Sequence, residues 1–282
     1  MFKRVMVSAI GVPALILILG VAPPGAAVVL TMALCGVGAR ELMSAAAGEG
    51  GEKLLRLTVL VAGVLPAIIY EEAGGNRTQT RLAILSDLPL TATLVLAFVL
   101  LLFLSAILDY TDQHRIAFSD VTAAMFSGAV FPLMISCLLL LRLEENGQLL
   151  VFVPLGISFG SDTFALFAGL LCGKHKLTPV SPKKTVEGAV GGLLGGVIGL
   201  SLAQGIGLWL LGLPLMSWGQ VVLVGLAGSV VSQIGDLSFS IIKREFGVKD
   251  YGKILPGHGG VLDRFDSVTF VAPFIWLVLS IL

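Results

Sequence analysis

Long stretches without a charged residue limit the folding of this chain more than any other feature. Gly188–Gly235 is a run of 48 residues without Asp, Glu, Lys or Arg, and Val5–Ala39 is another of 35. A helix needs roughly 20 apolar residues to cross a bilayer, so each run is long enough for two spans. The 282 residues are 56% apolar and only 13% charged, which excludes disorder and an ordinary water-soluble enzyme. The sequence therefore predicts an all-α, polytopic integral membrane protein.

Breaks between the apolar stretches predict about nine transmembrane helices. Pro23–Pro24 divides the first run into two helices, and residues 211–215 divide the run that begins at Gly188. The N-terminus resembles a signal peptide, but the many later spans favour a retained first helix. The remaining spans are expected at residues 54–70, 88–108, 121–141, 149–171 and 267–282.

The basic residues fall almost entirely on one side of this predicted topology. Only Arg77, Arg81 and Arg142 of the 18 Lys and Arg residues lie on the side opposite the N-terminus. Cytoplasmic loops are enriched in Lys and Arg, so the bias predicts a cytoplasmic N-terminus and cytoplasmic basic loops at 172–187 and 236–266. The compact chain, without a soluble extension, favours a plasma (inner) membrane protein.

We expect a single membrane domain over residues 1–282 with two functional parts. Residues 1–148 would hold helices 1–5 as a scaffold with dimer contacts. Residues 149–282 would hold helices 6–9 and the cytoplasmic loops that form the catalytic region. The net charge of zero gives no basic field for nucleic acid. The three cysteines lack zinc-binding spacing and are expected to be small buried side chains.

The densest polar region spans residues 232–267, at the junction of the last two predicted helices. Asp236, Asp250, Asp263 and Asp266 are oxygen ligands of the kind that magnesium prefers. The ends of the two helices can face each other and hold a metal ion between them. The alternative is a solvated loop with incidental ion pairs. Bases that can neutralise phosphate oxygens lie in the same region: Lys243, Arg244, Lys249, Lys253 and Arg264.

Two further stretches have the composition of anion-binding loops. His258 lies in Leu255–Gly260, where glycines and a proline predict a tight turn whose amides can hold an anion. A plain turn is the alternative there. Lys183 and Lys184 precede a glycine-rich helix start, which also favours an anion. The alternative for these lysines is a basic anchor loop without a ligand.

Asp162 is an ionisable residue inside a predicted span. A carboxylate at that depth is expected to line a polar cavity or to serve as a structural partner for a neighbouring helix, because contact with lipid is costly. The glycines of Gly188–Gly196 recur at helical spacing, and they predict close packing of one helix against another.

The pattern Ser-x2-Lys-Arg-x4-Lys-Asp-x-Gly-x2-Leu-Pro-Gly-His-Gly-Gly-x2-Asp-Arg-x-Asp runs over the 27 residues Ser240–Asp266. This stretch resembles the signature of the phosphatidate cytidylyltransferases, also called CDP-diacylglycerol synthases. Ser161–Gly169 and Ser181–Gly188 resemble the same family. Arg4, Gly11-x-Pro13 and Glu41–Leu42 fit it more loosely.

The resemblance implies a nine-helix membrane enzyme, often a homodimer, that converts CTP and phosphatidate into CDP-diacylglycerol and pyrophosphate with magnesium. It also implies a paired metal centre, potassium beside magnesium, at Asp236 and Asp263. With Asp266 added, these three aspartates are the predicted metal ligands. The predicted catalytic residues are Asp236, Lys243, Arg244, Lys249, Asp250, His258, Asp263, Arg264 and Asp266. The predicted substrate-binding residues are Asp162, Ser181, Lys183, Lys184, Ser240, Gly259 and Gly260.

Three other functions compete with this one. A transporter would explain Asp162 and the many spans, but not two basic loops and four aspartates concentrated on one face. A CDP-alcohol phosphatidyltransferase would carry an Asp-Gly-x2-Ala-Arg-x8-Gly-x3-Asp-x3-Asp pattern, which the sequence lacks. A cytidylyltransferase acting on isoprenoid lipids is the nearest enzymatic alternative.

Overall fold

The structure, a computed structural model, describes residues 11–74, 89–111, 115–212, 214–252, 254 and 259–281. Within these ranges, eight helices are long and apolar enough to cross a membrane, which confirms an all-α polytopic fold. Lys176 and Thr185 form an isolated β-bridge. A shorter apolar helix, Gly11–Val21, lies within the first predicted span and ends in the π-helical turn η1 (Leu17–Val21).

Two compact units make up the chain. The first combines Met1–Leu143 with the later segment Asp250–Asp263, and the second combines Glu144–Lys249 with Arg264–Leu282. Residues of the polar region around 250–263 therefore pack with helices from the start of the sequence.

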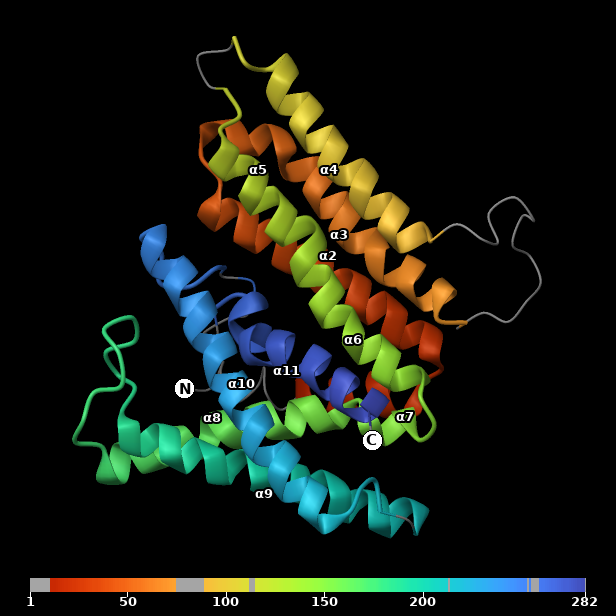
Figure 1. Ribbon diagram of the computed structural model, residues 1–282, viewed down its shortest axis with the longest axis vertical. Helices are drawn as coiled ribbons and strands as arrows, with labels where there is room; N and C mark the ends of the chain where they lie inside the picture. The colour runs from red at the N-terminus through yellow and green to blue at the C-terminus, as the bar shows by residue number, and fades with distance from the viewer. Residues whose placement is uncertain are drawn as a thin grey trace. The chain divides into compact units, whose positions relative to one another are not determined.

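The first unit begins with three membrane-length helices, shown in Figure 1. Helix α2 (Pro24–Ala46) starts at the second proline of the predicted break, because the fixed φ of proline suits the first turn of a helix. The short 3-10 turn η2 (Glu49–Gly51) leads into α3 (Glu52–Glu72), which packs on both α2 and α4 (Leu90–Leu108). Only 11% of the most apolar 18-residue stretch of α4 is buried inside the protein, as expected of a helix that faces lipid.

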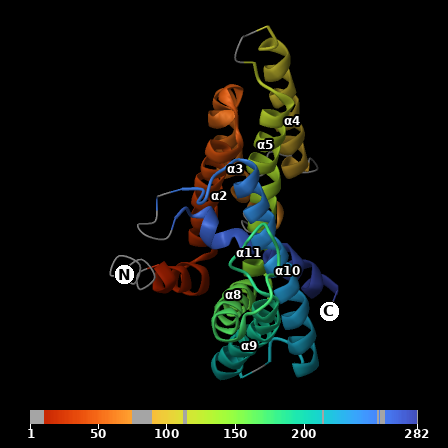
Figure 2. The same ribbon diagram turned by 90° about the vertical axis from the view of Figure 1, so that its left-hand side faces the viewer.

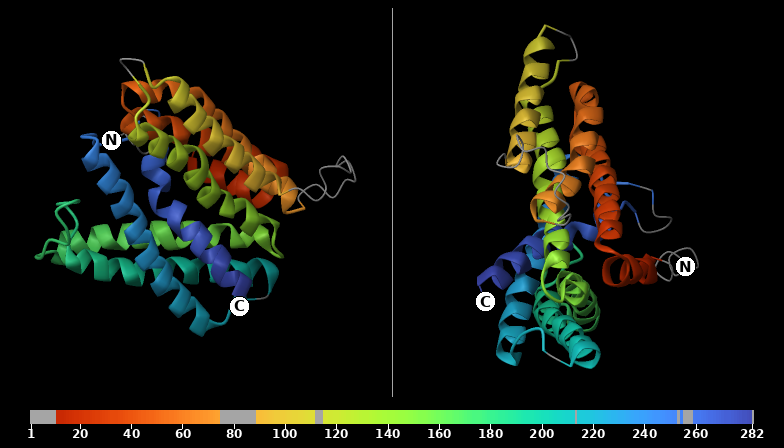
Figure 3. Two further views of the ribbon diagram at one scale, coloured as in Figure 1. Left: turned by 45° about the horizontal axis from the view of Figure 1, so that its top comes forward. Right: turned by 90° about the vertical axis from the view of Figure 1, so that its right-hand side faces the viewer.

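One long helical path completes this unit, running from α5 (Phe118–Met125) through the π-helical segment η4 (Phe126–Val130) into α6 (Phe131–Leu143) (Figure 3). It packs against α2 and α3. The buried core at one end of the unit joins four of these elements through Met43, Leu54, Phe98, Leu102 and Val121.

The second unit contains α7 (Gly147–Leu150), α8 (Phe152–Cys172), α9 (Val186–Leu211), α10 (Trp218–Glu245) and most of α11 (Leu262–Ile281). Helices α8 and α9 run side by side, and α10 packs against both, as Figures 1 and 2 show. The predicted division near 211–215 is confirmed, because α9 ends at Gly212 with a positive φ of 70° and Ser217 caps α10 through the amide of Gln220.

Glycines bring α8 and α9 close together, as their spacing predicts. A Cβ atom on Gly188 would lie 2.8 Å from the carbonyl oxygen of Ala165, and one on Gly156 would lie 3.0 Å from that of Gly199. Helix backbones can approach this closely only where no side chain separates them.

The last two helices are longer than their apolar segments suggest. Helix α10 continues nine residues past Asp236 to Glu245, so the prediction of a loop over 236–266 is wrong for that part. Helix α10 then ends because Gly247 adopts a positive φ of 66°. The amide of Val248 donates to the carbonyl of Lys243 across this end. Helix α11 begins at Leu262 rather than at residue 267. Hydropathy marks where lipid contact ends, whereas backbone hydrogen bonds continue the helix into polar sequence.

Candidate active site

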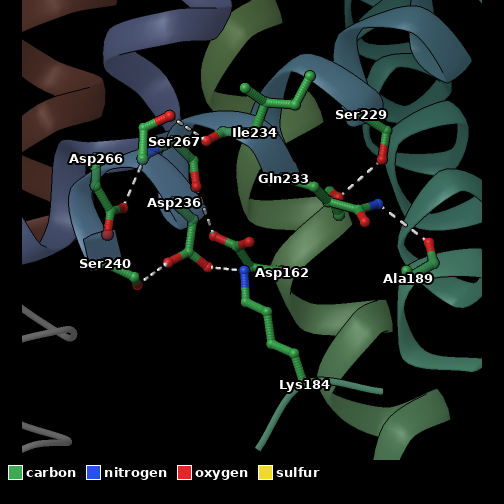
Figure 4. A network of polar contacts seen from close by, with 12 residues as sticks. Asp162, Lys184, Ala189, Ser229, Gln233, Ile234, Asp236, Ser240, Asp266 and Ser267 are labelled. Atoms are coloured by element: carbon green, nitrogen blue, oxygen red, sulfur yellow. Dashed lines mark hydrogen bonds and ion pairs between the residues drawn. The ribbon is translucent and has the colours of Figure 1, made fainter. Parts of the chain in front are cut away.

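Asp236, in the middle of α10, is the centre of a polar cluster in the second unit (Figure 4). Its Oδ2 atom forms an ion pair with the ammonium of Lys184, and its Oδ1 atom accepts a hydrogen bond of 3.4 Å from the hydroxyl of Ser240 one turn later. Both side chains of the ion pair are about three-quarters buried, with 27% of Lys184 and 23% of Asp236 exposed. The predicted metal ligand and the predicted phosphate-binding lysine are therefore direct partners.

Two more carboxylates lie beside this pair. The hydroxyl of Ser267 on α11 donates to Oδ2 of Asp162 on α8 at 3.5 Å, and the Ser267 amide donates to Oδ1 of Asp266 at 2.8 Å. Asp162 and Asp266 are both within electrostatic range of Asp236. Asp162 thus points toward neighbouring helices, in agreement with the expectation for a carboxylate inside a span.

Two predicted bases offset this concentration of negative charge. Arg264 attracts Asp162, and Lys243 attracts Asp266. Three helices and one loop of the second unit therefore bring together the carboxylates Asp162, Asp236 and Asp266 with the base Lys184.

The loop before α9 holds Lys184 in place. The amide of Lys184 donates to the carbonyl of Ser181 at 3.0 Å, closing a turn with Pro182 at its second position, and the Lys184 carbonyl accepts from Leu177 at 3.0 Å. Thr185 then caps α9 by accepting from the Gly188 amide at 3.0 Å. Lys183 is exposed, so of the two lysines it is Lys184 that the turn directs to Asp236.

Glu187 organises the beginning of the same loop. Its carboxylate accepts from the amides of Lys174 and His175 at 3.1 and 3.3 Å and lies 2.6 Å from Nδ1 of His175. Arg244, at the end of α10, donates from Nε to the carbonyl of Val180 at 3.2 Å. This predicted catalytic residue therefore ties the loop to α10.

A second set of predicted residues gathers in the first unit. Oδ2 of Asp263 accepts hydrogen bonds from the amides of Tyr251 and Gly260 at 2.9 and 3.0 Å. Gly259 has a φ of 86°, and a Cβ there would lie 3.0 Å from Asp263 Oδ2 and 3.6 Å from Cβ of Asp250. Asp250, Gly259, Gly260 and Asp263 thus form one folded segment. Lys249 and Asp250 are exposed, whereas Lys253 and His258 lie outside the described residues.

Buried polar contacts support the helices that carry the first cluster. The hydroxyls of Ser161 and Ser229 lie 2.8 Å apart, and Ser229 also donates to the carbonyl of Gly192 at 2.8 Å. Gln233, three residues before Asp236, donates to the carbonyl of Ala189 at 3.0 Å (Figure 4). Helices α8, α9 and α10 are therefore joined by hydrogen bonds as well as by glycine packing.

Sequence reasoning did not assign a role to Ser267, Glu187 or Glu41. Ser267 bonds both Asp162 and Asp266, and the carboxylate of Glu41 on α2 accepts hydrogen bonds from Val261 and Leu262. The position of Glu41 is the signal that could have identified it. Arg40 and Glu41 follow a 35-residue uncharged run, yet α2 continues past them to Ala46, so this acid lies inside a membrane-length helix.

Carboxylate oxygens near lysine and arginine suit a ligand that combines phosphate groups with a hard cation. The ion pair of Asp236 with Lys184 shows that this carboxylate accepts a cationic partner. In the part of the chain that the structure describes, no three His, Cys, Asp or Glu side chains are arranged closely enough to hold a metal ion. The donor chemistry fits magnesium, but an ion at Asp236 would have to replace the lysine ammonium.

The fold and this cluster define an integral membrane protein with a charged site of the kind that handles phosphate groups. Residues 2–282 match the Cytidylyltransferase family, so the chain belongs to that family. It is 35% identical to a phosphatidate cytidylyltransferase of Staphylococcus saprophyticus over 223 residues, which are 77% of this chain and 76% of the relative. It is 42% identical to a phosphatidate cytidylyltransferase of Bacillus subtilis over 160 residues, 56% of each chain.

Proposed function

We propose that this chain is a membrane nucleotidyltransferase that transfers the cytidylyl group of CTP to phosphatidate in phospholipid synthesis, giving CDP-diacylglycerol and pyrophosphate. Family membership and the names of the relatives support the reaction. The observation that carries the site is the ion pair of Lys184 with Asp236, beside Asp162 and Asp266, at the junction of four segments of the second unit.

In the proposed reaction, an ionised phosphate oxygen of phosphatidate attacks the α-phosphorus of CTP. The bond from that phosphorus to the oxygen bridging the α- and β-phosphates breaks, and pyrophosphate leaves with the electron pair. Phosphate is a sufficient nucleophile, so catalysis needs positioning and charge neutralisation more than a general base. Lys184 and Lys183 would bind phosphate oxygens as point charges, and Arg264 and Lys243 would stabilise the leaving group.

Magnesium is the proposed cofactor, with Asp236 and Asp266 as ligands and Asp162 beside them. A divalent ion bound there would supply further neutralisation of the phosphate oxygens. Its binding would release Lys184 from Asp236 and so make the ammonium available to the substrate. Asp263 as a metal ligand, and potassium as a second ion, stay predictions.

We also propose a plasma-membrane location with the Lys184 loop on the cytoplasmic face, where CTP is present, and a homodimeric enzyme. The bias of Lys and Arg toward one side supports the orientation.

The test is release of pyrophosphate by the purified protein in mixed micelles containing phosphatidate, CTP and magnesium. We expect release that requires all three components and yields CDP-diacylglycerol. Release with an isoprenyl phosphate but not with phosphatidate would assign the chain to a different lipid substrate, and a carrier would release no pyrophosphate.

A further inference from the structure

Glu41 is an acidic residue within a membrane-length helix, and its partners lie at the other end of the sequence. Only 5% of its surface is exposed. Its Oε1 and Oε2 atoms accept hydrogen bonds of 3.0 and 2.9 Å from the amides of Val261 and Leu262. These amides lie at the start of α11, Val261 just before it and Leu262 as its first residue, where a helix has donors without intrahelical partners and carries partial positive charge. Glu41 therefore caps α11 from a different helix.

Two glycines of the signature segment make room for this carboxylate. A Cβ on Gly252 would collide with Oε1 of Glu41, and a Cβ on Gly260 would lie 2.5 Å from Oε2. Neither glycine has a positive φ, so neither is required by its backbone conformation. Glycine is needed at both positions because the Glu41 carboxylate occupies the space that a side chain would fill.

Asp263 completes the arrangement from within the segment. Its Oδ2 atom accepts from the amides of Tyr251 and Gly260, while Glu41 accepts from the next two amides, those of Val261 and Leu262. Two carboxylates thus bind four backbone amides, three of which are consecutive. A change in the position of Glu41 would therefore move the backbone to which Asp263 is bonded.

We infer that Glu41 is a positioning residue for nucleotidyl transfer: its carboxylate holds the backbone of residues 260–262, and with it the Asp263 side chain, in the position needed for catalysis. This inference rests on the proposed function, because Asp263 matters to the rate only if the chain is the proposed enzyme. Both oxygens of Glu41 are bonded to backbone amides, which distinguishes its role from that of a residue in contact with substrate.

Glu41→Gln is the direct test, because a glutamine keeps the size but can accept with only one oxygen and turns its NH2 group, a donor, toward the other backbone amide. Glu72→Gln is the matched control. Glu72 on α3 caps α4 in the same manner, accepting from the amide of Thr91 at 3.1 Å and from its hydroxyl. Each variant is examined by hydrogen–deuterium exchange and by pyrophosphate release in the same micelles.

In Glu41→Gln we expect faster exchange at residues 259–262 and a kcat lower by about tenfold or more, since a charge-assisted bond to the backbone is lost. The KM for CTP should stay within about twofold, because Glu41 is proposed to make no contact with the nucleotide. Rescue by Glu41→Asp is expected to be partial. Glu72→Gln should change neither measurement. Unchanged exchange in Glu41→Gln, or faster exchange with an unchanged kcat, would overturn the inference.

The glycines provide a second, independent arm. Gly252→Ala alone should displace Glu41 and reproduce the lower kcat and faster exchange of Glu41→Gln. In a Glu41→Ala background the added methyl has space, so Gly252→Ala should cause no further loss, and additive effects would contradict the inference. If the wild-type protein releases no pyrophosphate, the proposed function fails. The exchange measurements then still decide whether Glu41 holds the segment.

Discussion

Asp236 and Asp263 are both expected metal ligands, yet they have different partners in the structure. Asp236 pairs with a lysine side chain, whereas the Asp263 carboxylate accepts from the backbone amides of Tyr251 and Gly260. A carboxylate paired with an ammonium can exchange that partner for another cation, and one bonded to amides is fixed by the backbone. At the scale of single residues, we therefore expect Asp236 to exchange its cationic partner and Asp263 to keep a fixed orientation.

Asp236→Asn should lower kcat by roughly 10² or more, the usual effect of removing one electrostatic contact to a transition state. A neutral amide is a poor magnesium ligand and cannot form the ion pair with Lys184. Pyrophosphate release gives the rate, and electron paramagnetic resonance of added Mn²⁺ gives ion binding independently. Asp109→Asn is the control, because it removes an ion pair with Lys53 (N–O distance 2.7 Å) within the first unit. Full Mn²⁺ binding by Asp236→Asn would disprove the ligand assignment.

Lys183 and Lys184 are adjacent and chemically identical, so together they form an internal comparison. We expect Lys184→Met to reduce kcat/KM by about tenfold or more, because a charged contact to phosphate is lost, while Lys183→Met has a smaller effect. Lys184→Met should also tighten Mn²⁺ binding, since the competing ammonium is removed from Asp236. Equal losses from both substitutions, with unchanged Mn²⁺ affinity, would favour a basic anchor loop.

At the residue scale, sequence identified the groups whose chemistry is unusual for a membrane protein. Asp162, Lys184, Asp236 and Asp266 were all predicted, and the structure brings them together. The sequence did not identify Ser267, which bonds both Asp162 and Asp266, because serines are frequent in this chain and only the contact of α8 with α11 makes this one distinctive. Local patterns identify donors and acceptors, but they do not identify partners that are distant in the sequence.

At the scale of helices, periodic glycines predicted contacts better than hydropathy predicted boundaries. The approach of α8 to α9 follows from the spacing of small residues. The end of α10 does not follow from composition, because Lys243 and Arg244 are polar but remain in the helix until Gly247 adopts a positive φ. Composition also did not predict the early start of α11, because the carboxylate of Glu41 that caps this start comes from α2.

Gly199→Ala should destabilise the protein by about 1–3 kcal/mol, because the added methyl would overlap the carbonyl oxygen of Gly156 on α8. Gly205→Ala lies six residues later on α9 and would meet no atom within 4 Å, so its effect should be neutral or slightly stabilising. The thermal unfolding midpoint in detergent distinguishes the two. A Gly199→Ala midpoint equal to that of Gly205→Ala would argue against close packing of α8 and α9.

At the scale of the whole molecule, the chain does not divide into units at one point in the sequence. Residues 250–263 belong with the N-terminal helices, although the residues on both sides of them belong with the second unit. Composition predicted the class correctly, and eight of the nine expected spans are membrane-length helices in the described ranges. It could not assign this segment, because long-range contacts such as that of Glu41 leave no periodic pattern.

The three cysteines offer a test of membrane orientation without the introduction of a new cysteine. Cys172, at the end of α8 beside the basic loop, is exposed, whereas Cys35 and Cys137 are buried. A membrane-impermeant maleimide should therefore label Cys172 in inside-out vesicles and leave right-side-out vesicles unlabelled. Cys172→Ala should remove the labelling. Reaction in right-side-out vesicles would reverse the proposed topology.

The partnership of Glu41 with α11 also has a consequence for how the protein is made. Glu41 is synthesised 220 residues before Val261, its first partner. At about 5–20 residues per second, the ribosome supplies that partner roughly 11–44 s later. During this interval the Glu41 carboxylate, near the end of α2, has to find its hydrogen-bond donors in water, lipid headgroups or the insertion machinery. The earliest helices to enter the membrane are thus among the last to reach their final structure, and a chain that stopped before residue 250 would leave this acid without its cap.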